Sequence, residues 1–493
     1  MVSRPGRKAS VLHLSMLGLG VLSLGGCASG SRPGLQVGPD YRAPSAQEEI
    51  SSLSTPTPEP RADLAAQPAS EFMRAFGDAA LLDVIDLATR RSPPLEQAAA
   101  RIRQARAAAG ASQANAAPTV AASGSLARAG RLEQSGQGSA AAAINAGWDL
   151  DVFGTALRAI EAADARRQSA ELSGQQARLS LTTEVASAYL TLRQCQAAAG
   201  LLEQEVKSRE TTATLTGVKA QAGAVALQEW DRSEAAVLDA RLRLASQQEV
   251  CNQGVHRLAL LAGVTPQGLP PSVLAARPLP QASVRPGEPV SVPAEVLARR
   301  PDVQAAERLL AAASADIGAT QAQYLPSLSL AGNIGLNLTG LGNDSISART
   351  WSFGPSLRLP VFDAGRRTAA IESAGGRYDE ALATWRQSVL QAAKEVEDAL
   401  SRTATARASA RVAQQAAERY AAHERAVRAR LSAGAASLLE LEDARRLAIA
   451  ARNAQLTAEL ELHQSRLALH KATGGDLSTS SEKASAEMPK EAR

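Results

Sequence analysis

The chain has 493 residues, of which 45% are hydrophobic and only 3% aromatic, and alanine swells the hydrophobic share. Small side chains of this kind suit closely packed helices better than one large globular core. The formal net charge is +4, but three basic residues lie in the first eight positions, so 50 of the 53 basic residues remain against all 49 acidic ones. The charge therefore gives no support to a nucleic-acid partner.

The N-terminus has the features of a signal peptide. Three basic residues precede an apolar stretch from Val11 to Leu24, which is too short to span a membrane. The letters "LGGC" then resemble the lipobox of bacterial lipoproteins, although an ordinary signal peptide with an incidental cysteine is the alternative. We predict that 1–26 is a lipoprotein signal peptide and that Cys27 is lipidated. In such signals an Asp after the cysteine retains the protein at the inner membrane, and Ala28 here implies sorting to the outer membrane.

Four segments alternate apolar and polar side chains with a period of two, although the first does so only weakly, and this pattern is typical of strands with one apolar face. The segments are 119–127, 144–152, 326–338 and 351–360. A sheet packed on a soluble core is the alternative, but the chain offers no separate hydrophobic layer to cover four strands. Apolar residues facing outward and polar residues facing inward predict a membrane β-barrel. Four strands would leave two unpaired edges, so we predict that several copies contribute four strands each to one barrel.

Two long helices follow the strand pairs. No proline occurs from Thr155 to Gln221 or from Arg366 to Leu431, and a run of about 65 residues extends roughly 100 Å as a helix. Apolar residues recur in steps of three and four along both runs, which predicts seams for neighbouring helices. The seam residues are Leu181, Val185, Ala188, Leu192, Cys195, Ala199, Leu202 and Val206 in the first run, and Ile371, Tyr378, Leu382, Trp385, Val389 and Val396 in the second. Gly223 and Gly434 then mark hairpin tips, after which a further helix turns back.

The two halves of the chain resemble each other, which indicates an internal duplication. "GASQANAAPTVAASG" at 110–124 aligns with "GATQAQYLPSLSLAG" at 318–332, at an offset of 208 residues. "AGAVALQEWDRSEA" from Ala222 aligns with "AGAASLLELEDARR" from Ala433, at an offset of 211. Each half therefore reads as helix, two strands, long helix, tip and returning helix.

Several motifs together resemble the outer membrane factor family, in its lipoprotein branch of TolC/OprM/NodT-like proteins. They are "GPDYRAP" at 38–44, the block "RRPDVQAAERLLAAASADIGATQAQYLPSLSLAG" at 299–332, the repeated "VF" strand end, and the tip sequence with "LLELEDAR". The resemblance implies a mixed α and β fold: a trimeric transmembrane β-barrel with four strands per chain, continued by a long periplasmic α-helical barrel. It also implies the exit duct of a tripartite efflux pump, with a homotrimer, a periplasmic adaptor, an inner-membrane RND-type transporter and outer membrane lipid as partners.

The predicted division of the chain follows from these features. Residues 27–92 form a lipid-anchored N-terminal segment with a first equatorial helix, 93–264 the first repeat, 265–298 a proline-rich connector, 299–475 the second repeat, and 476–493 a disordered tail.

In the family, apolar and acidic residues shortly after the second tip constrict the periplasmic entrance, and the matching positions are Leu439, Glu440 and Asp443. Their spacing of three and four residues places them on one helix face. The alternative is a solvated helix face with ordinary ion pairing to Arg445 or Arg446. We expect adaptor contacts around both tips.

Cys195 and Cys251 each lie 28 residues from Gly223. An antiparallel hairpin places them at the same height, and the periplasm is oxidising, so a disulfide is predicted. Two buried free thiols are the alternative.

The sequence gives no support to catalysis. The five histidines show no metal-ligand spacing, and neither a phosphate loop nor a nucleophile elbow is present, so we predict no catalytic residues, no metal and no cofactor. Two other functions stay open: a secretion duct for polypeptides, and a structural periplasmic coiled-coil lipoprotein.

Overall fold

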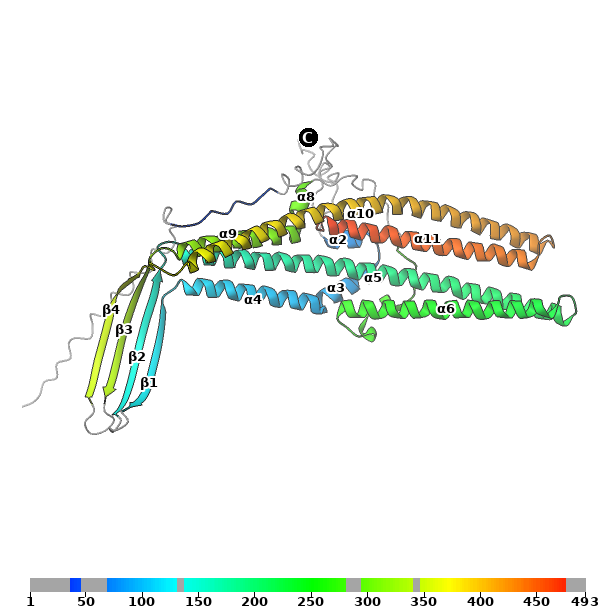
Figure 1. Ribbon diagram of the computed structural model, residues 1–493. Helices are drawn as coiled ribbons and strands as arrows, with labels where there is room; N and C mark the ends of the chain where they lie inside the picture. Colours follow the sequence, from blue (N-terminus) through cyan, green and yellow to red (C-terminus); the bar gives the residue numbers. More distant parts are fainter. Residues whose placement is uncertain (1–35, 46–68, 131–136, 281–293, 340–345, 476–493) are drawn as a thin grey trace, which may run out of the picture.

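The computed structural model describes residues 36–45, 69–130, 137–280, 294–339 and 346–475. A small β-sheet lies at one end of the molecule, and long helices run from it to two hairpin tips at the other end (Figure 1). The described chain is mostly helical with one four-stranded sheet, so the predicted mixed α and β fold with four strands per chain is confirmed.

The sheet has the strand order β1-β2-β3-β4, and every neighbouring pair is antiparallel. The strands are β1 (Thr119–Ala129), β2 (Gln137–Leu150), β3 (Ser327–Thr339) and β4 (Ile346–Arg358). Each pair keeps one register along its length, so alternate residues stay on the same face across the whole sheet. Among the described residues, β1 and β4 each pair with a strand on one side only.

The two faces of the sheet differ in polarity. On one face Ile334 of β3 lies opposite Trp351 of β4, and these side chains are 69% and 81% exposed. On the other face the Asn145 side chain donates a hydrogen bond to the Ser123 hydroxyl at 3.2 Å, and the Asn333 amide donates to that of Asn145. The predicted alternation is therefore confirmed, with a bare apolar face and a hydrogen-bonded polar one.

The helices form two hairpins with shorter helices beside them. In chain order they are α2 (Ala69–Arg74), α3 (Ala79–Arg91), α4 (Pro93–Asn115), α5 (Thr155–Gln221), α6 (Leu227–Ala262), α7 (Pro271–Leu274), α8 (Ala294–Ala298), α9 (Pro301–Ala322), α10 (Arg366–Ser432) and α11 (Leu438–Ala472), with a 3-10 turn at Pro266–Gly268. α5 and α10 have 67 residues each, so each extends about 100 Å. α6 and α11 return beside the tip halves of α5 and α10, whereas α4 and α9 lie beside the halves nearer the sheet (Figure 1).

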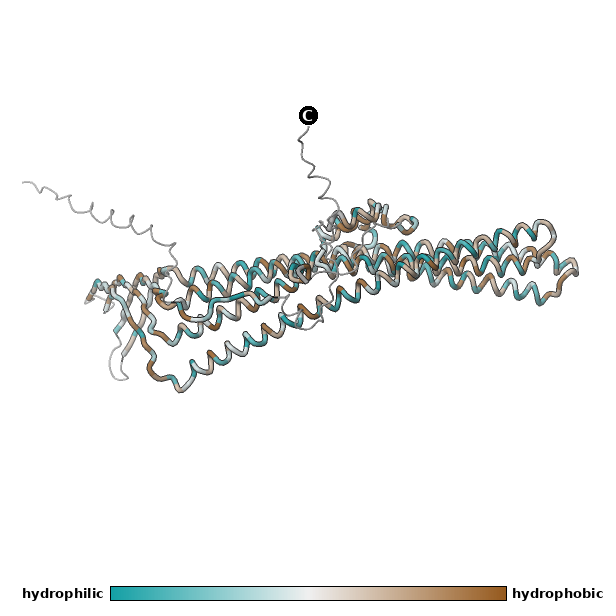
Figure 2. Tube along the Cα trace, turned by 90° about the horizontal axis from the view of Figure 1, so that it is seen from above, coloured by the Kyte–Doolittle hydropathy of each residue, from teal (hydrophilic) through white to brown (hydrophobic). Residues whose placement is uncertain are grey.

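The predicted heptad positions form the contacts between helices. The positions at most 9% exposed are Leu181, Val185, Ala188, Leu192, Cys195, Ala199 and Val206 on α5, and Trp385, Val389 and Val396 on α10. Hydrophobic and hydrophilic residues alternate along every helix instead of gathering in one apolar stretch (Figure 2). No helix among the described residues combines the length and the hydropathy that crossing a membrane requires.

Arg300 joins three helices at the start of the second repeat. Its side chain is 3% exposed, and its guanidinium donates to the carbonyl of Ala472 at the end of α11, at 2.9 Å. The same group pairs with Asp302 of α9 and Glu395 of α10, both at 2.7 Å. Burial by itself would raise the pKa of Asp302, but the Arg300 guanidinium holds this pKa below its ordinary value. Arg300 and Asp302 of the "RRPD" motif therefore hold the start of α9 next to the end of α11.

The connector between the repeats packs on the first hairpin. Arg193 of α5 is fully buried and donates to the backbone carbonyls of Ser272 and Val273, at 2.8 and 3.3 Å. Its guanidinium also lies over the ring of Tyr189, 4.6 Å from the centroid. The buried Val273 fills the adjoining core, so the first part of the proline-rich segment is an anchored layer on α5.

The segment 36–45 is held at the junction of sheet and helices. Arg158 at the start of α5 has a 5% exposed side chain and pairs with Asp40 at 2.7 Å. The hydroxyl of Tyr41 donates to the Glu307 carboxylate of α9 at 3.2 Å. These contacts fix the "GPDY" motif between the two repeats.

Two histidines of α11 are buried midway along the molecule. His463 and His470 are 3% and 0% exposed. Phe72 of α2 stacks on His470 with ring centroids 4.1 Å apart, and Phe76 lies 5.5 Å from His463. Burial lowers the pKa of each imidazole to about 4, and for His463 the charge of Arg466 adds to the effect.

Acidification should therefore weaken the folded protein between about pH 6.5 and 4. The unfolded chain protonates both imidazoles near pH 6.5, whereas the folded chain does so only near pH 4, so the contribution to stability is complete above pH 6.5 and is lost as the pH falls. Thermal unfolding followed by circular dichroism should show this slope, and the His463→Gln/His470→Gln variant should reduce it. The exposed His256→Gln is the control, and an unchanged slope in the double variant would contradict the assignment.

Candidate functional site

Both hairpin tips use a glycine in the left-handed backbone region. Gly223 has φ 73° and Gly434 has φ 72°, a conformation that costs other residues free energy. After Gly434, the Ser437 hydroxyl accepts a hydrogen bond from the Glu440 amide at 3.1 Å and so caps α11. The chain thus reverses tightly at the end opposite the sheet (Figure 1).

The three predicted gate residues lie in the first two turns of α11. Leu439 is 66% exposed. Glu440 pairs with Arg430 of α10 at 2.7 Å, and Asp443 pairs with Arg446 at 2.8 Å. The pairing of Asp443 with Arg446 is the one considered from the sequence, whereas the pairing of Glu440 with Arg430 was not considered. Each carboxylate therefore has a neutralising partner within one hairpin.

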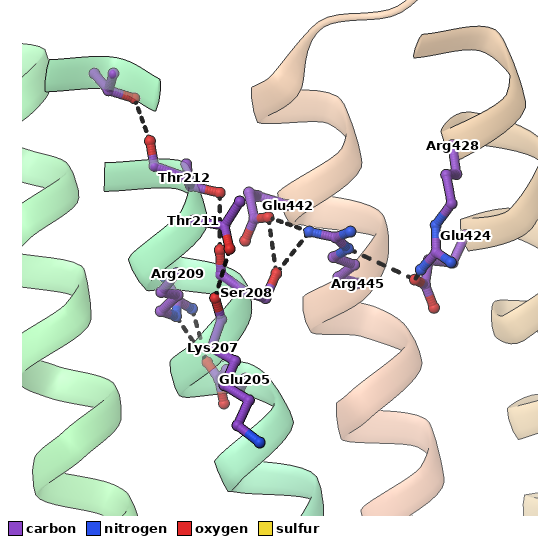
Figure 3. Close-up of polar contacts among 11 residues, drawn as sticks. Glu205, Lys207, Ser208, Arg209, Thr211, Thr212, Glu424, Arg428, Glu442 and Arg445 are labelled. Atoms are coloured by element: carbon purple, nitrogen blue, oxygen red, sulfur yellow. Dashed lines mark hydrogen bonds and ion pairs between the residues drawn. The ribbon is translucent and has the colours of Figure 1, made fainter. Parts of the chain in front are cut away.

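A partly buried polar link beside these residues joins the two hairpins (Figure 3). Ser208 of α5 donates to the Glu442 carboxylate of α11 at 3.0 Å. Arg445, one turn further along α11, donates to the Ser208 hydroxyl at 2.7 Å and to Glu442 at 2.9 Å. The Arg445 guanidinium also lies 3.7 Å from Glu424 of α10, which in turn pairs with Arg428. We call Ser208, Glu442, Arg445 and Glu424 the tip link.

The start of α11 therefore has three distinct faces. Leu441 and Ala444 are at most 3% exposed and pack against Val427 of α10. Glu442 and Arg445 face α5 through the tip link, with side chains 15% and 26% exposed. The remaining face carries the gate candidates, with Leu439 66% exposed and the side chains of Glu440 and Asp443 40% and 51% exposed.

The first hairpin has its own ion pairs, which begin three residues before Ser208 on α5. Glu205 of α5 has a 10% exposed side chain and pairs with Arg209 at 2.8 Å and with Arg243 of α6 at 2.9 Å. The pair with Arg243 joins α5 to α6, so this ion pair holds the two helices of the first hairpin together.

The tip link was not predicted from the sequence. Glu442 and Arg445 lie three residues apart on a helix, which is a recognisable ion-pair spacing. Ser208 lies 234 residues away from Glu442, so this contact depends on how α5 and α11 pack. That packing has no signature in either helix alone.

Cys195 and Cys251 are joined by a disulfide bond in the structure, with Cα atoms 5.6 Å apart and a sequence separation of 56 residues. The bond connects α5 to α6 at the height expected from equal distances to Gly223. The corresponding residues of the second hairpin, Ala406 and Leu462, have no such bond. The oxidation state in the cell stays a prediction, tested below.

The other predicted features fall in two groups. Cys27, the signal peptide 1–26 and the tail 476–493 lie outside the described residues. Within the described part of the chain, no group of three His, Cys, Asp or Glu side chains is arranged to hold a metal ion.

Comparisons with known proteins support the architecture. Residues 84–264 and 292–475 match the family described as outer membrane efflux protein. The antibiotic efflux pump outer membrane protein ArpC of Pseudomonas putida is 30% identical over 97% of this chain and 99% of its own length. Nodulation protein T of Rhizobium leguminosarum bv. trifolii is 32% identical over 66% of this chain and 70% of its own length.

A solved structure shares the whole fold. The outer-membrane channel OprN is 30% identical, has a TM-score of 0.75, and is matched over 89% of this chain and 99% of its own chain. The long helices and the four-stranded sheet are therefore those of an outer membrane channel subunit.

The tip link should hold the start of α11 against α5. Arg445→Gln removes its contacts to Ser208, Glu442 and Glu424, and charge-assisted hydrogen bonds of this kind contribute about 1.5–3 kcal/mol. Amide hydrogen exchange over 438–446 should then accelerate on the order of tenfold or more.

The matched control is Arg446→Gln, which removes only an exposed pair with Asp443. Its exchange should stay close to that of the unchanged protein. Equal acceleration in both variants would show that the tip link does not hold α11.

The cysteine pair should be oxidised in the mature protein. Unfolding in denaturant followed by alkylation should leave Cys195 and Cys251 unmodified until a reductant is added, and each should then take one label in the mass spectrum. The closed loop of 56 residues corresponds to about 4 kcal/mol in the chain-entropy account, so Cys195→Ser/Cys251→Ser should lower the unfolding temperature. Labelling without reductant would contradict the disulfide.

Proposed function

The chain belongs to the outer membrane efflux protein family, and we propose that three copies form the passive outer membrane exit duct of a tripartite efflux pump. The sheet carries this proposal. Its edge strands β1 and β4 offer backbone N–H and C=O groups that hydrocarbon cannot satisfy, so a membrane-embedded sheet must close. Three copies with four strands each supply twelve strands, which is within the range of membrane barrels.

The two faces of the sheet support the same arrangement. The apolar face with Ile334 and Trp351 suits lipid, and the face with Asn145, Asn333 and Ser123 suits a water-filled lumen. The helices of about 100 Å then continue the duct into the periplasm. A purely structural coiled-coil lipoprotein would leave the exposed apolar face unexplained.

The chain acts in the outer membrane as an efflux channel component, as its relatives do. We assign to it toxic small molecules as cargo, a periplasmic adaptor bound around the helix tips, and an RND-type transporter in the inner membrane. ArpC supports this assignment because it is named as part of an antibiotic efflux pump. Lipid on Cys27 would add an anchor in the same membrane.

The gate is proposed at the second tip. Around a threefold axis, the exposed face of α11 would present three copies each of Leu439, Glu440 and Asp443. The ion pairs to Arg430 and Arg446 mean that closure depends on paired charges and apolar contact, not on a bare acidic ring. The tip link would hold the second hairpin against α5 in the closed state, and opening would require it to break.

Conductance in planar bilayers tests the duct and its gate together. The unchanged protein should insert as a trimer and conduct weakly. Glu440→Gln/Asp443→Asn removes six ion pairs per trimer at ~0.2–1 kcal/mol each and leaves six unpaired arginines, so conductance should rise on the order of tenfold and favour anions.

The control for that experiment is Glu397→Gln/Asp398→Asn, which removes the same charge from α10 far from the tip. Its conductance should match that of the unchanged protein. If the tip variant conducts like the unchanged protein, the gate lies elsewhere. If the protein never inserts into the bilayer, the proposal that it forms a duct is wrong.

A further inference from the structure

Two arginines lie on the apolar face of the sheet, near the end farther from the helices. Arg128 is the penultimate residue of β1, and Arg349 is the fourth residue of β4. The unbroken register places Arg128 on the same face as Leu126, and Arg349 on the same face as Trp351. Leu126 and Trp351 are both 81% exposed, so each arginine is the next residue on this face of its own strand toward the sheet's outer end.

The charged residues of the strands are sharply segregated. Besides these two arginines, the described strands contain Asp149 and Arg358, which lie at the helix end of the sheet and on its polar face. Arg128 and Arg349 are exposed, and neither forms an ion pair or a side-chain hydrogen bond within the described chain. Their charges therefore have no counterion on the protein surface that the structure describes.

A guanidinium on a lipid-facing surface is unfavourable within the hydrocarbon and becomes tolerable only near the headgroups. Its planar fork matches the oxygens of a phosphate group and stays charged at every physiological pH. On its own strand, each arginine lies outward of an exposed apolar residue, on the side away from the periplasmic helices, so the outer leaflet is the nearer source of the anion. We propose that Arg128 and Arg349 bind phosphate groups of an anionic glycolipid in that leaflet.

The position of the two residues makes this a site between subunits, which rests on the proposed trimeric barrel. Arg128 is on the edge strand β1 and Arg349 on the opposite edge strand β4. Closing the barrel brings β4 of one copy beside β1 of the next, so each seam receives both arginines. A phosphorylated lipid at the seam would therefore bridge two chains.

Native mass spectrometry of the full-length protein in detergent tests the proposal, with purified bisphosphorylated lipid A as the probe. The unchanged protein should retain lipid A, and Arg128→Gln/Arg349→Gln should bind it on the order of tenfold more weakly. Arg358→Gln, an arginine of the same sheet on the other face, should bind like the unchanged protein. Arg128→Lys/Arg349→Lys should fall between them, because the charge remains without the fork.

Two further probes identify the source of the anion. Lipid A stripped of its phosphates should lose most of its binding, and inorganic phosphate alone should not displace lipid A. The proposal is overturned by equal lipid binding in the Gln variant, by equal binding of the stripped lipid, or by displacement with inorganic phosphate.

The lipid-site proposal and the duct proposal can be tested separately. The Arg128→Gln/Arg349→Gln variant should form the same heat-modifiable trimer and the same conductance as the unchanged protein, since neither residue faces the lumen. Loss of lipid binding with conductance intact therefore supports the site, whereas a protein without trimer or conductance overturns the proposed function first.

Discussion

The unpaired edges of the four-stranded sheet are the constraint on which the rest of this structure depends. Backbone N–H and C=O groups at β1 and β4 need partners, and the exposed apolar face of the same strands favours lipid over water. A chain with these properties is incomplete as a monomer. Because each sheet continues directly into helices of about 100 Å, any assembly that closes the sheet also brings the helices of several copies together.

In the helical part, short helices pack one after another along the two long helices. α5 and α10 are continuous, whereas α6 and α11 end midway and α4 and α9 take over beside them. Such a break exposes helix ends that need hydrogen-bond partners. Arg300 supplies one at the end of α11, and the buried Arg193 satisfies carbonyls of the connector that covers the break in the first repeat. Buried arginines thus mark the level at which each helical layer changes.

The sequence predicted what depends on local periodicity, and it missed what depends on packing between distant segments. The strands, the two 67-residue helices, the tip glycines and the seam around Trp385 and Val389 were read from spacing alone. Asp443 was considered with Arg446 because the two lie on one helix. Ser208 and Glu442 meet only because α5 packs against α11, and the contact of His463 with Phe76 requires the segment after α2 to lie on α11. No pattern within one segment encodes such contacts.

The two repeats share one architecture but are stabilised differently, which bears on which of them can move. The first hairpin is fixed along its length by the Cys195–Cys251 bond, by Arg193 on the connector and by Glu205 between α5 and α6. The second hairpin has alanine and leucine at the cysteine positions, and near its tip it is joined to α5 through the hydrogen bonds of Ser208 with Glu442 and Arg445, which water can replace. A covalent cross-link cannot open and close, but a polar link can at modest cost. The duplication therefore has a covalent cross-link between helices in the first hairpin only, and the candidate gate lies on the hairpin without one.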